Sequence, residues 1–100
     1  MAPGIHELRE SIDQIDRQIV RLLAERLELV KRVGEIKRGH GLNVHDPVRE
    51  RDLLEKVASA APEPLSPEMA ERIFQCIIQE SRNLEQRHVT ALSTNPKPTP

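Results

Sequence analysis

The sequence predicts an all-α fold with three helices per chain, one long, one short and one of medium length. Apolar residues recur at helical spacings of three and four, and no segment alternates apolar and polar residues as a strand would. The prolines support the same division. None occurs between Pro3 and Pro47, and the others cluster within 62–67 and 96–100. Because proline interrupts helices, this pattern leaves three helix-length windows and a tail.

The first window carries one seam at alternating spacings of three and four. Its ten positions are Ile5, Leu8, Ile12, Ile15, Ile19, Leu22, Arg26, Leu29, Val33 and Ile36. The seam predicts a single helix from Ile5 to about Arg38, on the order of 50 Å long. A compact monomer of this size has a radius of gyration of about 13 Å, so the helix must overhang its own domain. Its apolar seam therefore needs a second chain.

Two cap patterns predict the shorter helices. Asp46 is an N-cap residue followed by proline at the first helical position, and the second helix then extends to about residues 60–61. Ser66 repeats the pattern before Pro67, and the third helix is expected to end near His88.

The tail lacks periodicity. We expect residues 89–100 to be disordered, or to be the stub of a linker to another module, and we place one helical domain at residues 1–88.

Composition excludes several classes of protein. A single aromatic residue, Phe74, and a net charge of −1 argue against nucleic acid as a partner. A single cysteine, Cys76, cannot form an internal disulfide, and no Cys or His pair has the spacing of zinc ligands, so we expect no metal. No apolar run is long enough to cross a membrane, and the charged N-terminal segment does not resemble a signal peptide. We therefore expect a cytoplasmic protein.

Arg26 is the one charged residue in the seam of the first helix. An arginine in such a position either extends its charged end to solvent or meets a fixed anion, and both interpretations stay open. Lys37 lies eleven positions on, within about 20° of the same helix face. Arg9 lies seventeen positions before Arg26 and about 100° around the helix, so it cannot serve the same pocket from the same chain. It is placed to serve a pocket of a partner chain.

The other two helices also carry polar groups on their apolar faces. Asp46, Arg49 and Glu50 share a face with the core residues of the second helix. A solvated first turn explains Asp46 as a cap but does not explain Arg49. In the third helix, Ser81 and Glu85 continue the apolar face at a spacing of four, and Ser81 alone would be expected to bond to the preceding turn.

Together the helices contribute four cations, Arg9, Arg26, Lys37 and Arg49, which suit a small polyanion. The sequence offers no nucleophile with a neighbouring base, no metal cluster and no glycine-rich phosphate loop. Any catalysis should therefore be electrostatic and positional, without a metal or cofactor.

Five segments of the sequence resemble the all-helical class of chorismate mutases in order and spacing. They are Leu8-Arg9-Glu10-Ser11-Ile12-Asp13, Leu22-Leu23-Ala24-Glu25-Arg26, Val33-Gly34-Glu35-Ile36-Lys37, Asp46-Pro47-Val48-Arg49-Glu50-Arg51 and Phe74-Gln75-Cys76-Ile77-Ile78-Gln79-Glu80-Ser81. The resemblance implies an intertwined homodimer with two shared active sites. It also implies the Claisen rearrangement of chorismate, a dicarboxylate, to prephenate in aromatic amino-acid biosynthesis.

The resemblance further implies a role for each cation. Arg9 from the other chain, Arg26 and Arg49 resemble the residues that grip the carboxylates. Lys37 resembles the residue that reaches a carboxylate and the ether oxygen. Ser81 resembles a helper at a carboxylate.

The remaining site residues are acidic. Asp46, mainly through its backbone, and Glu50 resemble the partners of the ring hydroxyl. Glu85 stands at the position of the ether-oxygen donor, where many bacterial members have glutamine, so it must carry a proton to donate. The resemblance marks Lys37, Glu85 and Arg26 as the catalytic residues.

Two alternatives stay open from the sequence. Isochorismate pyruvate lyase uses the same scaffold and a similar set of charges. A non-catalytic dimerisation or regulatory module, attached to a larger enzyme through the tail, is the other. The presence of all four cations argues against a purely structural role, because a seam that served only to join two chains would be more stable with leucine at position 26.

Overall fold

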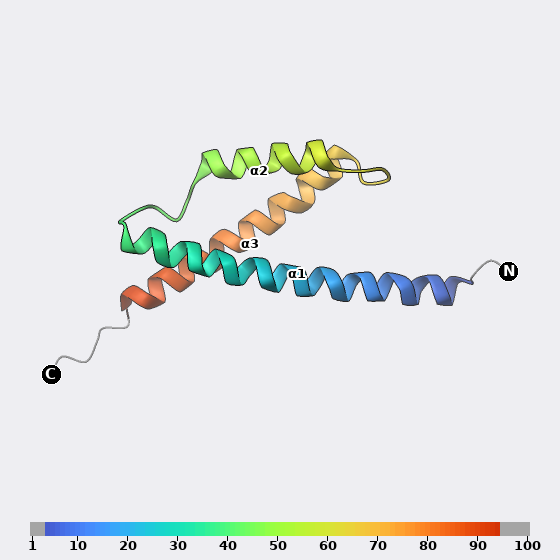
Figure 1. Cartoon of the computed structure of the whole chain (residues 1–100), viewed down its shortest axis with the longest axis horizontal. Coiled ribbons are helices and arrows are strands. Elements are labelled where there is room, and N and C mark those ends of the chain that lie inside the picture. Colours follow the sequence, from blue (N-terminus) through green and yellow to red (C-terminus); the bar gives the residue numbers. More distant parts are fainter. Residues whose placement is uncertain (1–3, 95–100) are drawn as a thin grey trace.

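A computed structural model of the chain describes residues 4–94, with only the backbone described for residues 93 and 94. It contains three helices and no strand within that range: α1 (Ile5–Gly39), α2 (Pro47–Ala60) and α3 (Pro67–Thr94). The predicted all-α fold with one long, one short and one medium helix is confirmed. α1 and α2 each pack against α3, which crosses between them, and they do not pack closely against one another (Figure 1).

α1 ends in a Schellman motif that turns the chain toward α2. The Leu42 amide donates to the Lys37 carbonyl at 2.7 Å, and the Gly41 amide donates to the Arg38 carbonyl at 3.2 Å. Gly41 has a φ of 67°, which glycine adopts without the strain that a side chain would add. The motif fixes Lys37 in the last turn of α1, close to the start of α2.

The predicted caps of α2 and α3 are confirmed. The Asp46 side chain accepts a hydrogen bond from the Arg49 amide at 3.1 Å, with Pro47 as the first helical residue. The Ser66 hydroxyl oxygen accepts one from the Met69 amide, also at 3.1 Å. Both helices therefore begin where local side-chain chemistry satisfies their first free amides.

The predicted end of the third helix near His88 is wrong. The disorder predicted for the tail is also wrong for residues 89–94, which are helical. α3 continues to Thr94 because it still packs on the end of α1. His88 Nε2 lies 2.8 Å from Glu35 Oε1, and Arg38 donates to the Leu92 carbonyl at 3.4 Å. The rest of the predicted tail, residues 95–100, lies outside the described residues.

The close crossing of α1 and α3 is made at Gly34, the buried residue of α1. A Cβ atom there would lie 2.8 Å from Cγ of Glu85 and 3.1 Å from Cγ2 of Val89. The missing side chain lets α3 approach closely enough to place Glu85 against α1.

A single chain buries very little apolar surface. Among the side chains that the structure describes, the buried hydrophobic ones are Ala70 and Ile78. The nine aliphatic residues of the α1 seam are all 46% to 68% exposed. The N-terminal part of α1 projects beyond the other helices (Figure 1), and the radius of gyration is 18.3 Å against about 13 Å for a compact chain of this length. The predicted overhang of the long helix is confirmed.

None of the three helices, over the residues described, is long and apolar enough to cross a bilayer.

Candidate active site

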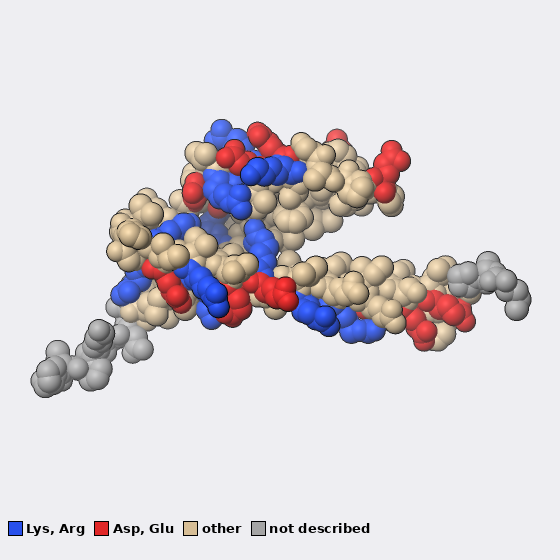
Figure 2. Space-filling view, viewed as in Figure 1, with Lys and Arg blue, Asp and Glu red and all other residues tan. Residues whose placement is uncertain are grey.

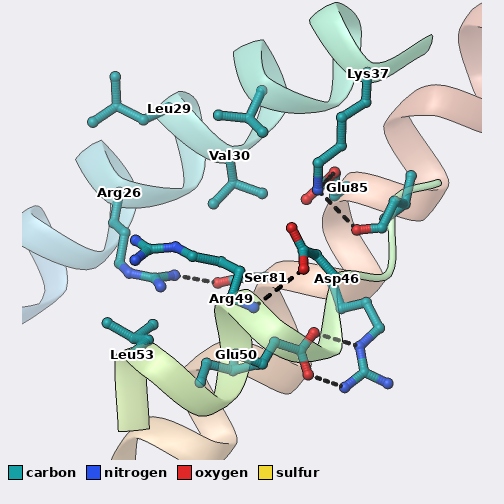
Figure 3. A pocket seen from close by; sticks show the side chains of 14 residues that line it. Arg26, Leu29, Val30, Lys37, Asp46, Arg49, Glu50, Leu53, Ser81 and Glu85 are labelled. Atoms are coloured by element: carbon teal, nitrogen blue, oxygen red, sulfur yellow. Dashed lines mark hydrogen bonds and ion pairs between the residues drawn. The ribbon is translucent and has the colours of Figure 1, made fainter. Parts of the chain in front are cut away.

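A cavity of about 300 Å³ lies between α1 and α2, and residues of α3 also line it. This volume is at the lower end of the range for small-molecule sites. Lys and Arg side chains gather around the hollow between α2 and the C-terminal half of α1 (Figure 2). Seven residues predicted from the sequence line the cavity: Arg26, Lys37, Asp46, Arg49, Glu50, Ser81 and Glu85. Figure 3 shows these side chains converging from all three helices.

Arg26 turns into this cavity and contacts α3. Its Nη1 donates to the Ser81 hydroxyl at 2.5 Å, and that hydroxyl donates in turn to the Ile77 carbonyl at 2.6 Å. The predicted bond from Ser81 to the preceding turn is confirmed, and the same hydroxyl also orients the guanidinium. Ser81 is buried, so it holds Arg26 from a fixed position.

Three arginines line the cavity, and two of them, Arg26 and Arg49, lack an acidic partner among the described residues. Within residues 4–92, neither Arg26 nor Arg49 forms an ion pair with a carboxylate. Burial lowers the pKa of Arg26 below its ordinary value, and the positive charge of Arg49 lowers it further. A bound carboxylate would offset both effects by supplying the missing negative charge.

Lys37 is held at the other end of the cavity. Its Nζ donates to the Val44 carbonyl at 2.9 Å and lies 3.1 Å from Oε2 of Glu85. Glu85 is buried, with 7% of its surface exposed, and its Oε2 forms no well-aligned hydrogen bond. The pair places one cation and one carboxyl group side by side on the cavity wall (Figure 3).

Asp46 and Glu50 line the α2 side of the cavity. The Asp46 carboxylate is engaged in capping α2. Glu50 accepts two hydrogen bonds from Arg82 on α3, at 2.8 Å and 3.2 Å. Sequence reasoning missed Arg82, although its spacing from Ile78 and Glu85, four and three residues, puts all three on neighbouring positions of one helix face.

Arg9 does not reach this cavity from its own chain. It lies seventeen residues before Arg26 on the same straight helix, about 26 Å away along the axis. It is absent from the cavity lining. Its predicted role depends on a second chain and stays a prediction.

The arrangement favours binding of an anion over bond-forming catalysis by the protein. Ser81 is bonded to Arg26 and to a backbone carbonyl, and none of its hydrogen-bond partners among the described residues is a general base. Among the described residues, no three His, Cys, Asp or Glu side chains are grouped as metal ligands. Fixed cations in a partly buried hollow can hold carboxylates and stabilise negative charge that develops during a reaction.

Fold and cavity together define a small helical protein with a pocket lined by basic side chains from all three helices. The chain belongs to the chorismate mutase type II family, whose sequence model matches residues 8–86.

Three known proteins illustrate this similarity. The chain is 32% identical over 90 residues to a chorismate mutase of Methanocaldococcus jannaschii, covering 89% of this chain and 91% of that protein. It is 53% identical over 53 residues to a bifunctional chorismate mutase/prephenate dehydratase of Aquifex aeolicus, covering 53% of this chain and 15% of that protein. A chorismate mutase structure from Thermus thermophilus superposes with a TM-score of 0.81 at 36% identity, covering 83% of this chain and 94% of that one.

The chain therefore matches a small part of the bifunctional relative and nearly the whole of the other two proteins.

Proposed function

We propose that this protein catalyses the rearrangement of chorismate to prephenate. In this reaction the ether C–O bond breaks while a new C–C bond forms within the same molecule. Electrons move around a closed ring of atoms, and no proton, electron or leaving group enters or leaves. The protein is required to hold a dicarboxylate in its compact conformation and to stabilise charge on the ether oxygen, which fixed polar groups can do without covalent participation.

The observation that carries this proposal is the pair of arginines with no carboxylate of their own. Arg26 and Arg49 both line one cavity, and Ser81 holds Arg26 there. The chain that carries them belongs to a family of chorismate mutases. Two like charges in one cavity disfavour each other unless an anion lies between them. A carboxylate of the substrate fits that requirement, and Arg26 and Arg49 are proposed to grip it.

The reacting end of the substrate is assigned to Lys37 and Glu85. Both lie at the cavity wall opposite Arg26, joined by their ion pair. Lys37 is proposed to contact the ether oxygen and a carboxylate. Glu85, when protonated, is proposed to donate a hydrogen bond to the same ether oxygen. Asp46 and Glu50 are assigned to the ring hydroxyl from the α2 side.

The working form is proposed to be a homodimer in which each cavity receives Arg9 from the partner subunit. The exposed seam of α1 supports this assembly, because nine aliphatic side chains in water need a second apolar surface. A second hollow of about 340 Å³, lined by Leu23, Arg26, Leu27, Cys76, Ile77, Glu80 and Ser81, shares two residues with the active-site cavity. If the α1 helix of the partner subunit occupies this second hollow, its Arg9 would lie near Arg26 and the active-site cavity. A cytoplasmic location stays a prediction.

The direct test is loss of chorismate absorbance with the purified chain, repeated with Arg26→Ala. Isochorismate is offered in parallel, with release of pyruvate as the readout. Conversion of chorismate to prephenate that depends on Arg26 supports the proposal. Turnover of isochorismate alone would replace the mutase by a lyase, and turnover of neither substrate would contradict an enzymatic role.

A further inference from the structure

Arg82 is a cavity residue that the proposed reaction does not use. It lies on α3, directly after Ser81, and lines the active-site cavity beside Glu50. Its Nη2 donates to Oε1 of Glu50 at 2.8 Å, and its Nε donates to Oε2 at 3.2 Å. Figure 3 shows both contacts as dashed lines at the carboxylate of Glu50. The two residues are 32 positions apart and join α2 to α3.

The geometry is that of a bidentate pair. Two parallel contacts from one planar guanidinium fix the plane and direction of a carboxylate, which a single contact cannot do. The other basic side chain near Glu50 is His45, whose Nε2 lies 3.7 Å from Oε1, beyond hydrogen-bond distance. The orientation of Glu50 therefore depends mainly on Arg82.

The charges in the cavity lead to the same conclusion. A site for a dianion is weakened by a free carboxylate on its wall, since like charges repel at short range. The guanidinium of Arg82 offsets the negative charge of Glu50 and uses two of its N–H donors for this contact. Arg26 and Arg49, in contrast, form no ion pair with a carboxylate in the part of the chain that the structure describes, so their charge is available to a bound anion.

We propose that Arg82 is a positioning residue for the rearrangement: it orients Glu50 as acceptor for the ring hydroxyl of the substrate and compensates its charge. This rests on the proposed function, in which Glu50 receives that hydroxyl. Arg82 itself has no direct contact with substrate in this role. Each carboxylate oxygen keeps acceptor capacity after bonding to Arg82, so Glu50 can still accept the hydroxyl.

A double-mutant cycle separates action through Glu50 from direct action. Arg82→Met, Glu50→Ala and the double variant are compared with the wild type by kcat and KM for chorismate. We expect Arg82→Met to lower kcat/KM about tenfold, chiefly through KM, because the hydroxyl contact is present in both ground and transition states. In the Glu50→Ala background the same change should alter kcat/KM by less than about twofold, because its only target has gone.

Two further variants distinguish positioning from folding. Arg82→Lys keeps the positive charge but loses the two parallel N–H donors of the guanidinium. Its kcat/KM should therefore lie between those of the wild type and Arg82→Met. Arg72→Met is the matched control: Arg72 is exposed on the same helix and lies nine residues, half a turn in orientation, from Ser81. It should leave kcat and KM unchanged. Melting temperature and oligomeric mass are measured for every variant.

The outcomes are distinct. Equal losses from Arg82→Met with and without Glu50 would overturn the inference, because Arg82 would then act on the substrate or the fold directly. An unchanged KM and kcat in Arg82→Met would overturn it as well. If Arg82→Met fails to fold, the comparison is made with Arg82→Lys in both backgrounds, and a loss independent of Glu50 again counts against it. A wild-type chain without mutase activity would overturn the proposed function, and this inference with it.

Discussion

Lys37 and Glu85 form an ion pair across the crossing of α1 and α3, with Nζ 3.1 Å from Oε2. The Lys37 side chain is 18% exposed and that of Glu85 is 9% exposed, so the pair is largely shielded from water. The Val44 carbonyl takes a second contact from the same ammonium and ties it to the segment that leads into α2. A substrate that needs Lys37 must therefore compete with Glu85 for it, which links the two residues functionally.

The pH dependence of the reaction should follow the protonation of Glu85. A protonated carboxyl group donates to the ether oxygen, whereas a carboxylate repels the charge that develops there. We expect kcat/KM to rise as pH falls through the range where Glu85 gains its proton. Glu85→Gln, which donates at every pH, should flatten the profile near neutrality. A wild-type profile without slope on the acidic side, unaffected by Glu85→Gln, would exclude this role.

Arg26→Ala should reduce activity far more than stability. The side chain has no acidic partner within residues 4–92, and burial together with Arg49 lowers its pKa, so its charge costs rather than contributes folding free energy. Loss of a preorganised donor typically lowers kcat by about 10²-fold. We expect a loss of that order with a melting temperature close to that of the wild type.

The control for this prediction is Arg17→Ala. Arg17 is exposed on α1, nine residues from Arg26 and half a turn away in orientation. Its replacement should leave both quantities unchanged. Parallel losses of activity and melting temperature in Arg26→Ala would assign Arg26 a structural role instead.

Gly34→Ala should damage both the fold and the site. The added Cβ would lie 2.8 Å from Cγ of Glu85 and 3.1 Å from Cγ2 of Val89, so α3 or the Glu85 side chain must shift. Overpacking of this kind lowers the free energy of unfolding by about 1–3 kcal/mol. A displaced Glu85 side chain would also lower kcat. Gly39→Ala is the matched change, because its Cβ would meet nothing within 4 Å. Thermal unfolding and kcat for both variants test this, and equal behaviour of the two would show that the close crossing is unimportant.

The sequence predicts most of the fold because each helix has a local signal. The seam of α1 fixes its length, and Asp46 and Ser66 mark the starts of the other two helices through bonds that involve neighbouring residues only. The end of α3 is different. Val89 packs near Gly34 and Leu92 receives a bond from Arg38, so its last turns depend on contacts between helices, which local patterning does not contain.

The same distinction applies to the site. Helix spacing and the family resemblance bring out the residues that interrupt apolar faces, and seven of these line one cavity. Arg82 is not predicted from the sequence, because an arginine at the edge of an apolar helix face has the pattern of a solvated residue. It gains Glu50 as a partner only through the packing of α2 against α3. The role of Arg9 remains a prediction because it depends on a second chain, which is proposed and not observed.

Hybrid dimers test whether two chains build each pocket. Arg9→Ala and Arg26→Ala chains should each be nearly inactive, since every site in either variant lacks one arginine. When equal amounts of the two are allowed to exchange subunits, about half of the dimers are hybrids, each with one site that has both arginines and one that has neither. The mixture should regain about a quarter of the wild-type activity. A mixture that stays at the mean of its two parents, while mass measurements show that the subunits have exchanged, would contradict shared sites.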